Sequence, residues 1–388
     1  MTAAPAVPAA GERFLPLDGL RGVAALGVVA FHVAVSASSA FPQLDSLYLF
    51  VDFFFVLSGF VLVPSMPRRP RRFGRDWGGF LVRRIFRLWP LSIAAVLVAL
   101  GLLAWERQVM LDSGSFEVPY GSLAGQAPGQ QMTVLVCAFL LLQVFSAQAI
   151  AINVPLWSLS AEWIANVLFG PLTIWRWGIG IALGVLAGYA MLAYGLTTDT
   201  AFIDASGPIR GWEAVGRAFI GFGLGLLLRL NLDRLARFRT WWLLVIALAL
   251  VASFYFIEKD WHWDSYRYAI TYFAAPVFAF LILQISKFRV DAASRWGKFL
   301  GFLGVYSFGI YVFHQPLIQW VNLVIGTPSA ATFRWSWPWA SFFIAEGVGV
   351  TFVAILITFL LRFIWERPMQ RLGKRWSDRI EAKQSPPR

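Results

Sequence analysis

Long apolar runs separated by short polar connections dominate this chain. A helix needs roughly 20 apolar residues to cross the ~30 Å hydrocarbon core of a bilayer. Ten runs of about that length lie at 17–38, 47–65, 82–104, 159–175, 178–196, 212–230, 240–257, 269–287, 300–323 and 340–363. Because a backbone inside lipid must satisfy its own hydrogen bonds, each run is expected to be helical. The pattern predicts an all-α, polytopic membrane protein with about ten transmembrane helices.

Composition supports this interpretation. Of the 388 residues 58% are hydrophobic and only 14% are charged, which is far from the usual balance of a soluble domain. The single cysteine, Cys137, excludes a disulfide framework and a cysteine-based zinc site, and we expect no metal.

Basic residues are distributed unevenly between the connections and fix the expected orientation. The segments 66–87, 229–239 and 287–298 and the tail from 362 are rich in Arg and Lys. The intervening connections hold five basic residues in total, namely Arg107, Arg210, Lys259, Arg267 and Arg334. By the bias of Lys and Arg toward the cytoplasm, the first group lies inside and both termini are cytoplasmic. The net charge of +12 therefore indicates topology, and we expect no nucleic-acid partner.

An eleventh apolar run, 131–150, conflicts with the even number of crossings that two cytoplasmic termini require. We interpret it as a re-entrant segment or as a helix that packs among the others without crossing. The alternative is that it crosses and that 159–196 is one overlong segment. In either case residues 15–366 form one transmembrane domain. It is preceded by a loose tail, 1–14, and followed by a basic cytoplasmic tail, 367–388, whose last part (376–388) is expected to be loose.

Ionisable residues inside these runs are candidates for function, because each is costly to bury in lipid. In the first run Arg21 and His32 are eleven residues apart, so on a helix they share one face about 16 Å apart. Asp18 precedes Arg21 by three residues and can pair with it. The alternatives are purely structural: Arg21 would anchor the end of the helix, and His32 would be a core residue with its hydrogen bonds satisfied.

Three further runs place polar residues where the outer half of the membrane is expected. Asp52 begins the second run, where its charge also suits a helix N-terminus. Glu162 follows Ser158, which suits an N-cap, so part of this motif is explained by helix capping. Ser307, Tyr311 and His314 form one helical stripe.

These residues are expected to sort by depth. Arg21, Arg84 and Arg87 would gather near the cytoplasm, where an anion is the natural partner of Arg87. His32, Asp52, Glu162 and His314 would gather in the outer half. There a histidine can take a proton from an alcohol while a nearby carboxylate orients it.

Five motifs in this order resemble the acyltransferase-3 family of bacterial integral-membrane O-acyltransferases. They are Asp18-Gly-Leu-Arg21-Gly with His32, Val51-Asp52-Phe-Phe-Phe-Val-Leu-Ser58-Gly59-Phe60, Arg84-x-x-Arg87-x-x-Pro90, Leu156-Trp157-Ser158-Leu159-Ser160-x-Glu162, and Ser307-x-x-Ile310-Tyr311-x-x-His314. The resemblance extends over residues 14–366, which is nearly the whole chain.

The resemblance implies transfer of an acyl group, commonly acetyl, from cytoplasmic acyl-CoA to a hydroxyl of an extracytoplasmic carbohydrate, in the bacterial inner membrane beside membrane lipid. His32 would act as general base or as transient acyl carrier, with Glu162, Asp52 and His314 completing the catalytic set. Arg21, Arg84 and Arg87 would hold the CoA phosphates. Substrate contacts are expected at Trp157, Ser158, Ser160 and Tyr311. The alternative function is a transporter or flippase of a glycolipid or acylated substrate, in which the same charges would line a path.

Overall fold

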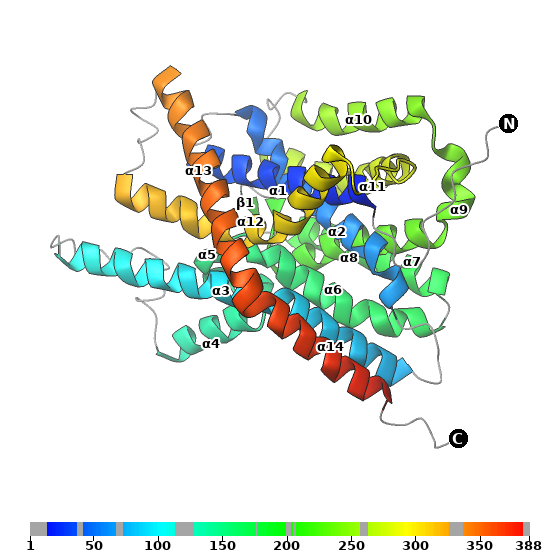
Figure 1. Ribbon diagram of the computed structural model, residues 1–388, viewed down its shortest axis with the longest axis horizontal. Coiled ribbons are helices and arrows are strands. Elements are labelled where there is room, and N and C mark those ends of the chain that lie inside the picture. The colour runs from blue at the N-terminus through cyan, green and yellow to red at the C-terminus, as the bar shows by residue number, and fades with distance from the viewer. Residues whose placement is uncertain are drawn as a thin grey trace.

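The computed structural model describes residues 14–36, 42–66, 73–112, 128–175, 177–198, 203–204, 207–256, 263–325 and 337–382. In these ranges the chain is a bundle of helices (Figure 1), which confirms the predicted all-α class. The only strands there are two residues long, β1 (Ile203–Asp204) and β2 (Gly207–Pro208), and they pair antiparallel. The predicted loose segment 1–14 lies outside the described residues except for Phe14.

Each of the ten predicted apolar runs falls on helical structure. The helices are α1 (Leu15–Ser36), η1 (Pro42–Leu49), α2 (Phe50–Leu62), η2 (Val63–Ser65), α3 (Phe73–Asp112), α4 (Pro128–Phe139), η5 (Gln143–Phe145), α5 (Ala147–Ile152), α6 (Leu156–Trp175), α7 (Trp177–Thr198), α8 (Gly211–Leu230), α9 (Leu232–Leu235), η6 (Ala236–Phe238), α10 (Trp241–Phe256), α11 (Trp263–Ile285), α12 (Arg295–Ile325), α13 (Trp337–Leu361), η7 (Arg362–Glu366) and α14 (Arg367–Ala382). The η elements are 3₁₀ helices, apart from η7, which is a π-helix.

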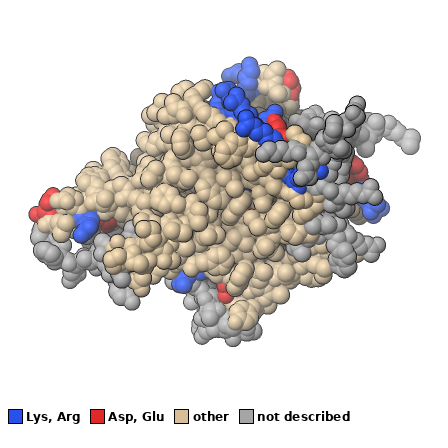
Figure 2. Space-filling view, turned by 90° about the horizontal axis from the view of Figure 1, so that it is seen from below, with Lys and Arg blue, Asp and Glu red and all other residues tan. Residues whose placement is uncertain are grey.

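The protein is a multi-pass membrane protein. Six helical segments in the described ranges are long and apolar enough to span a bilayer, and a seventh is added if the bent pair of α8 with α9 and η6 counts as one span. On the face shown in Figure 2 the charged side chains gather in small groups near the margins, and the broad surface between them is uncharged. Such a surface suits contact with lipid. The predicted number of ten crossings stays a prediction.

The apolar run 131–150 does not form one continuous helix. It folds as α4, a turn in which Leu141 adopts a φ of 54°, the short helix η5, and α5. None of these pieces approaches the length that a crossing requires, which agrees with the interpretation of a non-crossing segment. The alternative of one helix over 159–196 is wrong, because α6 ends at Trp175 and α7 begins at Trp177, and the two helices contact each other.

Helix α1 lies against α12 over much of its length. A Cβ atom on Gly22 would collide with Leu303, and one on Gly304 would come within 2.8 Å of the Cβ of Asp18. Only glycine therefore allows this close approach. Along α1, Arg21 contacts Ser307 and His32 contacts His314, so successive contacts advance in the same direction on both helices. The two helices consequently run parallel.

Helix α2 packs on α8 through a second set of close contacts, and an ion pair is enclosed between them. The guanidinium of Arg217 donates to both carboxylate oxygens of Asp52, at 2.8 and 3.2 Å, and also to the Pro208 carbonyl at 3.1 Å. The side chains are 0% and 1% exposed. The Trp157 ring covers the guanidinium, with its centroid 4.9 Å away. Asp52 does lie in the first turn of α2, as predicted, but its charge is neutralised by Arg217, which the sequence did not single out.

The C-terminal segment differs from its prediction. Residues 367–382 form α14, so the expectation of a loose chain from 376 onward is wrong for 376–382. Figure 1 shows α14 alongside α3, and contacts between the two helices agree. Arg83 on α3 binds both Ser377 and Glu381 on α14. A Cβ at Gly373 would strike the Phe86 ring, so the helices meet closely there. Apolar and polar residues separate onto opposite faces of α14, which explains why a strongly charged segment still docks.

We expect the buried pair of Asp52 and Arg217 to govern the stability of the α2–α8 contact. Arg217→Met should lower the free energy of unfolding by about 3–5 kcal/mol, because it leaves an uncompensated carboxylate in the interior. The double variant Asp52→Leu with Arg217→Met should recover most of this loss. Unfolding in mixed detergent micelles measures both. A double variant no more stable than Arg217→Met would contradict the assignment of the loss to the unpaired charge.

Candidate active site

Arg21 is fixed between α1 and the first half of α12. Its Nε donates to the Ser307 hydroxyl at 2.9 Å, and one terminal nitrogen donates to the Gly304 carbonyl. The same terminal nitrogen lies 3.4 Å from Asp18, so the pairing predicted from the i, i+3 spacing is confirmed. These contacts hold the guanidinium at a defined place on α12.

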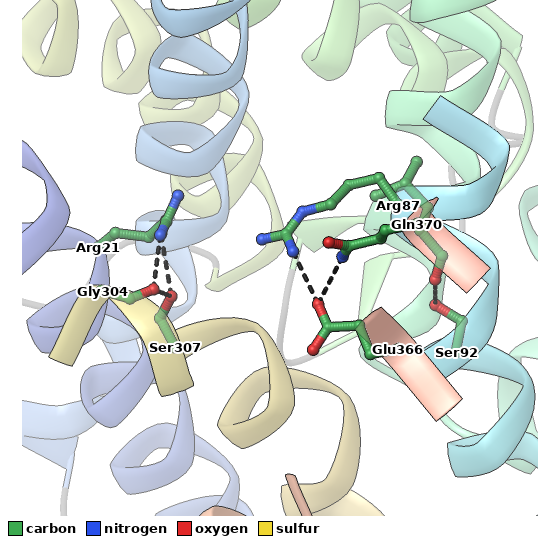
Figure 3. A network of polar contacts seen from close by, with 8 residues as sticks. Arg21, Arg87, Ser92, Gly304, Ser307, Glu366 and Gln370 are labelled. Carbon is green, nitrogen blue, oxygen red and sulfur yellow. Dashed lines mark hydrogen bonds and ion pairs between the residues drawn. The ribbon is translucent and has the colours of Figure 1, made fainter. Parts of the chain in front are cut away.

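Arg87 approaches the same region from α3 (Figure 3). Its terminal nitrogen donates to Glu366 on η7 at 2.7 Å, and the Gln370 amide donates to the same oxygen at 2.8 Å. The prediction of a bound anion as the natural partner of Arg87 missed this carboxylate. The Arg87 side chain nevertheless stays 40% exposed, so it can still contact a ligand.

A cavity of about 600 Å³ separates these two arginines and is bounded by both. Its wall contains Arg21, Arg87, Arg229, Arg362 and Arg367. Asp18 and Glu366 are the two carboxylates of this wall, so positive charge is in excess by three. Apolar side chains complete it, among them Leu17, Leu57, Phe60 and Val305. A site of this kind can bind a multiply charged anion that also carries an apolar portion. We refer to it below as the arginine cavity.

Arg84 does not share the arginine cavity. It pairs with Glu162 on α6 in a contact that leaves only 13% of the Arg84 side chain and 9% of the Glu162 side chain exposed. The prediction that Arg84 lies in an inner group and Glu162 in an outer group is therefore wrong, because the two side chains meet at one depth. The N-cap assignment is wrong as well. Helix α6 begins at Leu156, so Ser158 lies inside it and donates to the Pro155 carbonyl instead.

His32 and His314, which were predicted to lie at one depth, contact each other. Nε2 of His314 lies 3.2 Å from Nδ1 of His32, and Nδ1 of each ring also lies within 3.0–3.2 Å of the backbone carbonyl four residues earlier in its own helix. A carbonyl oxygen only accepts hydrogen bonds, so each Nδ1 carries a proton and each Nε2 is left with a lone pair. The single Nδ1–H of His32 is therefore shared between the Val28 carbonyl and the Nε2 of His314.

The Nε2 of His32 has no hydrogen-bond partner among the described residues, and its side chain is partly exposed. This arrangement corrects one expectation. His314 and the Val28 carbonyl orient the His32 ring, whereas the sequence suggested a carboxylate for this role. The free Nε2 lone pair is the feature of this pair that can take part in chemistry.

The four predicted substrate contacts are all buried. The Tyr311 hydroxyl lies 2.6 Å from the Ser158 hydroxyl and 3.1 Å from the Pro155 carbonyl. Ser160 accepts from the Val144 amide at 3.4 Å, and Trp157 covers Arg217. All three members of the Ser307, Tyr311 and His314 stripe are buried. The structure thus gives these side chains protein partners, and their contact with substrate stays a prediction.

Several functional candidates were missed by the sequence analysis. Arg229, Arg362 and Arg367 were counted only as orientation signals, although they line the arginine cavity. Glu366 was placed at the end of the domain without a role. An available signal was that Arg362 and Glu366 lie four residues apart, one helical turn, at the end of the last apolar run.

Comparisons with known proteins show the family to which the chain belongs. The family model described as an acyltransferase domain matches residues 15–362. Acyltransferase MdmB from Streptomyces mycarofaciens is 27% identical over 94% of this chain and 93% of its own length. No solved structure matches the chain.

Two further relatives cover smaller parts. Protein 2 in picA locus from Rhizobium radiobacter is 36% identical over 43% of this chain and 83% of its own length. A putative peptidoglycan O-acetyltransferase, YrhL, from Bacillus subtilis strain 168 is 35% identical over 24% of this chain and 14% of its own length.

The Arg84–Glu162 pair generates a testable prediction. Arg84→Gln and Glu162→Gln should each lower thermal stability in detergent, because each leaves one buried charge without its partner. The exchanged double variant Arg84→Glu with Glu162→Arg should recover part of the loss. The measurement is the midpoint of thermal aggregation, with the exposed Arg371→Gln on α14 as control. A Glu162→Gln variant as stable as wild type would show that Glu162 is free for another role.

Proposed function

Because the chain belongs to the acyltransferase-3 family, we propose that this membrane acyltransferase moves an acyl group, typically acetyl, from cytoplasmic acyl-CoA to a hydroxyl of an extracytoplasmic carbohydrate. The acceptor class includes surface polysaccharide, lipopolysaccharide and peptidoglycan sugars. The proposed location is the bacterial inner membrane, with both termini in the cytoplasm, in accord with the distribution of Arg and Lys.

One observation carries this proposal: α1 bears the arginine cavity near its beginning and a histidine with a free lone pair eleven residues later. The separation corresponds to about 16 Å along the helix. A molecule that is anionic at one end and reactive at the other suits such a helix. Acyl-CoA has this form, because its phosphates and its thioester lie at opposite ends of the extended pantetheine arm.

The arginine cavity supports the donor assignment. Phosphate oxygens are good acceptors for guanidinium groups. Arg21 is held in place by Ser307 and Gly304, so little side-chain entropy is lost when it binds a phosphate. The apolar wall suits the uncharged part of the pantetheine arm. Arg84, engaged with Glu162, is assigned a structural role in this proposal and not a direct contact with CoA.

The His32 geometry supports the chemical step. Nε2 accepts the proton of the acceptor hydroxyl while the oxygen attacks the thioester carbonyl. A C–O bond forms, the C–S bond breaks, and the departing thiolate takes that proton from His32 to become CoA thiol, which restores the neutral imidazole. The hydrogen bond from Nδ1 to the Val28 carbonyl holds the ring in the tautomer that leaves Nε2 free. In the alternative mechanism the same Nε2 attacks the thioester and carries the acyl group to the acceptor.

Removal of His32 should abolish turnover. We expect His32→Ala to lower acyl transfer by about 10²–10⁴-fold, because the proton acceptor is lost. The assay is thiol release from acetyl-CoA by purified protein with a sugar acceptor. The control is His262→Ala, the remaining histidine of the chain. Wild-type rates in His32→Ala would end the catalytic assignment, and no thiol release by wild-type protein would favour the transporter alternative.

The arginine cavity should set the affinity for the donor. Arg21→Gln and Arg87→Gln should each raise KM for acetyl-CoA about tenfold to a hundredfold, because each removes a charge-assisted hydrogen bond to phosphate. With acetyl-pantetheine, which lacks the nucleotide phosphates, both variants should match wild type. Arg371→Gln on α14, outside the arginine cavity, is the control. An equal loss with both donors would contradict phosphate binding.

A further inference from the structure

A second cavity lies between α12 and α13. It shares no lining residue with the arginine cavity. It has a volume of about 320 Å³, and its wall is almost entirely apolar, with Leu317, Val321, Val350 and Val353 among its side chains. The exception is Glu346 on α13. We refer to this space as the Glu346 pocket.

Glu346 is unusual because its carboxyl group has no partner among the described residues. The residue is 6% exposed, and both of its carboxylate oxygens are shielded from solvent without a hydrogen-bond partner among the described residues. By contrast, the buried carboxylates of Asp52, Glu162 and Glu366 each bind an arginine. An isolated carboxylate in the interior of a membrane protein is costly. A partner brought by a ligand would remove this cost.

The position of Glu346 suits access from the membrane. It lies nine residues after the start of α13 at Trp337, or about 13.5 Å along the helix axis. The Glu side chain has several rotatable bonds, so the carboxylate can turn toward the space that it lines. A molecule that dissolves in the bilayer can therefore reach the pocket from the side.

The aromatic side chains of the wall select the chemistry of the ligand. Trp320 and Phe342 line the same pocket. Aromatic faces attract ammonium groups, and a carboxylate beside them adds an opposite charge. A hydroxyl would satisfy only the carboxylate, and an alkyl chain would satisfy only the apolar wall. A protonated amine on an apolar body satisfies the carboxylate, the aromatic rings and the apolar wall together.

We propose that the Glu346 pocket is a binding site for an apolar molecule that carries a protonated amine. The amine pairs with the Glu346 carboxylate and lies against Trp320 or Phe342, and the apolar body fills the space between α12 and α13. This site does not depend on the proposed acyl transfer, since none of its lining residues lies in the arginine cavity or the histidine pair.

The test uses full-length protein in nanodiscs and tritiated 4-phenylbutyldimethylamine as probe. Saturable binding is expected in wild type, and Glu346→Gln should weaken it about 30-fold or more, because the partner of a buried charge is removed. Trp320→Leu should weaken it less. Asp378→Asn, which removes an exposed carboxylate on α14, should bind as wild type does. The neutral analogue with carbon in place of nitrogen, 5-methylhexylbenzene, should not compete.

Thermal stability provides the second measurement. Without probe, Glu346→Gln should be at least as stable as wild type, because the substitution removes an unpaired buried charge and no contact. The probe should raise the unfolding midpoint of wild type and leave that of Glu346→Gln unchanged. Equal binding to wild type and Glu346→Gln, or equal competition by the neutral analogue, would overturn the proposal and identify the pocket as a site for apolar chains only.

Discussion

The close parallel packing of α1 on α12 is the constraint on which the candidate site depends. Gly22 and Gly304 allow the two helices to approach until backbone meets side chain. At that separation Arg21 reaches Ser307, and His32 reaches His314 further along the same pair. If the helices were farther apart, both contacts would open. The His32 ring would then lose the neighbour that helps to orient it. The residues that α1 and α12 contribute to the wall of the arginine cavity would move apart.

Buried charges form the second organising element. Arg84 pairs with Glu162, Asp52 with Arg217, and Arg87 with Glu366. Each pair joins helices that are far apart in the sequence, and each satisfies a charge that lipid cannot solvate. These pairs add little net stability compared with apolar residues of similar shape. Their contribution is specificity, because a wrong helix register would leave two charges without partners.

The sequence predicted the helices well and the pairing of side chains only in part. Apolar runs and glycine positions are local properties, so α1, α8 and α12 could be located from the pattern alone. Helical spacing placed His32 and His314 at one depth, but the contact between them was not predicted. The pairing of Glu162 with Arg84 was missed, because the two residues were assigned to groups at different depths. The partner of a buried charge is not a local property, so Arg217 and Glu366 could not be identified in this way.

The contrast between paired and unpaired carboxylates separates structural from functional charges in this molecule. The carboxylates of Asp52 and Glu162 lose their hydration on burial, and an ion pair with an arginine offsets the cost in each case. Glu366 also pairs with an arginine, Arg87, but that arginine stays partly exposed and lines the arginine cavity. This pair therefore joins α3 to η7 and also presents positive charge to the cavity. Glu346 has no such partner among the described residues, so the cost of its burial is not offset there. A residue that weakens the fold without compensation is explained most simply by a partner from outside the chain, and the aromatic wall beside Glu346 indicates the chemistry of that partner.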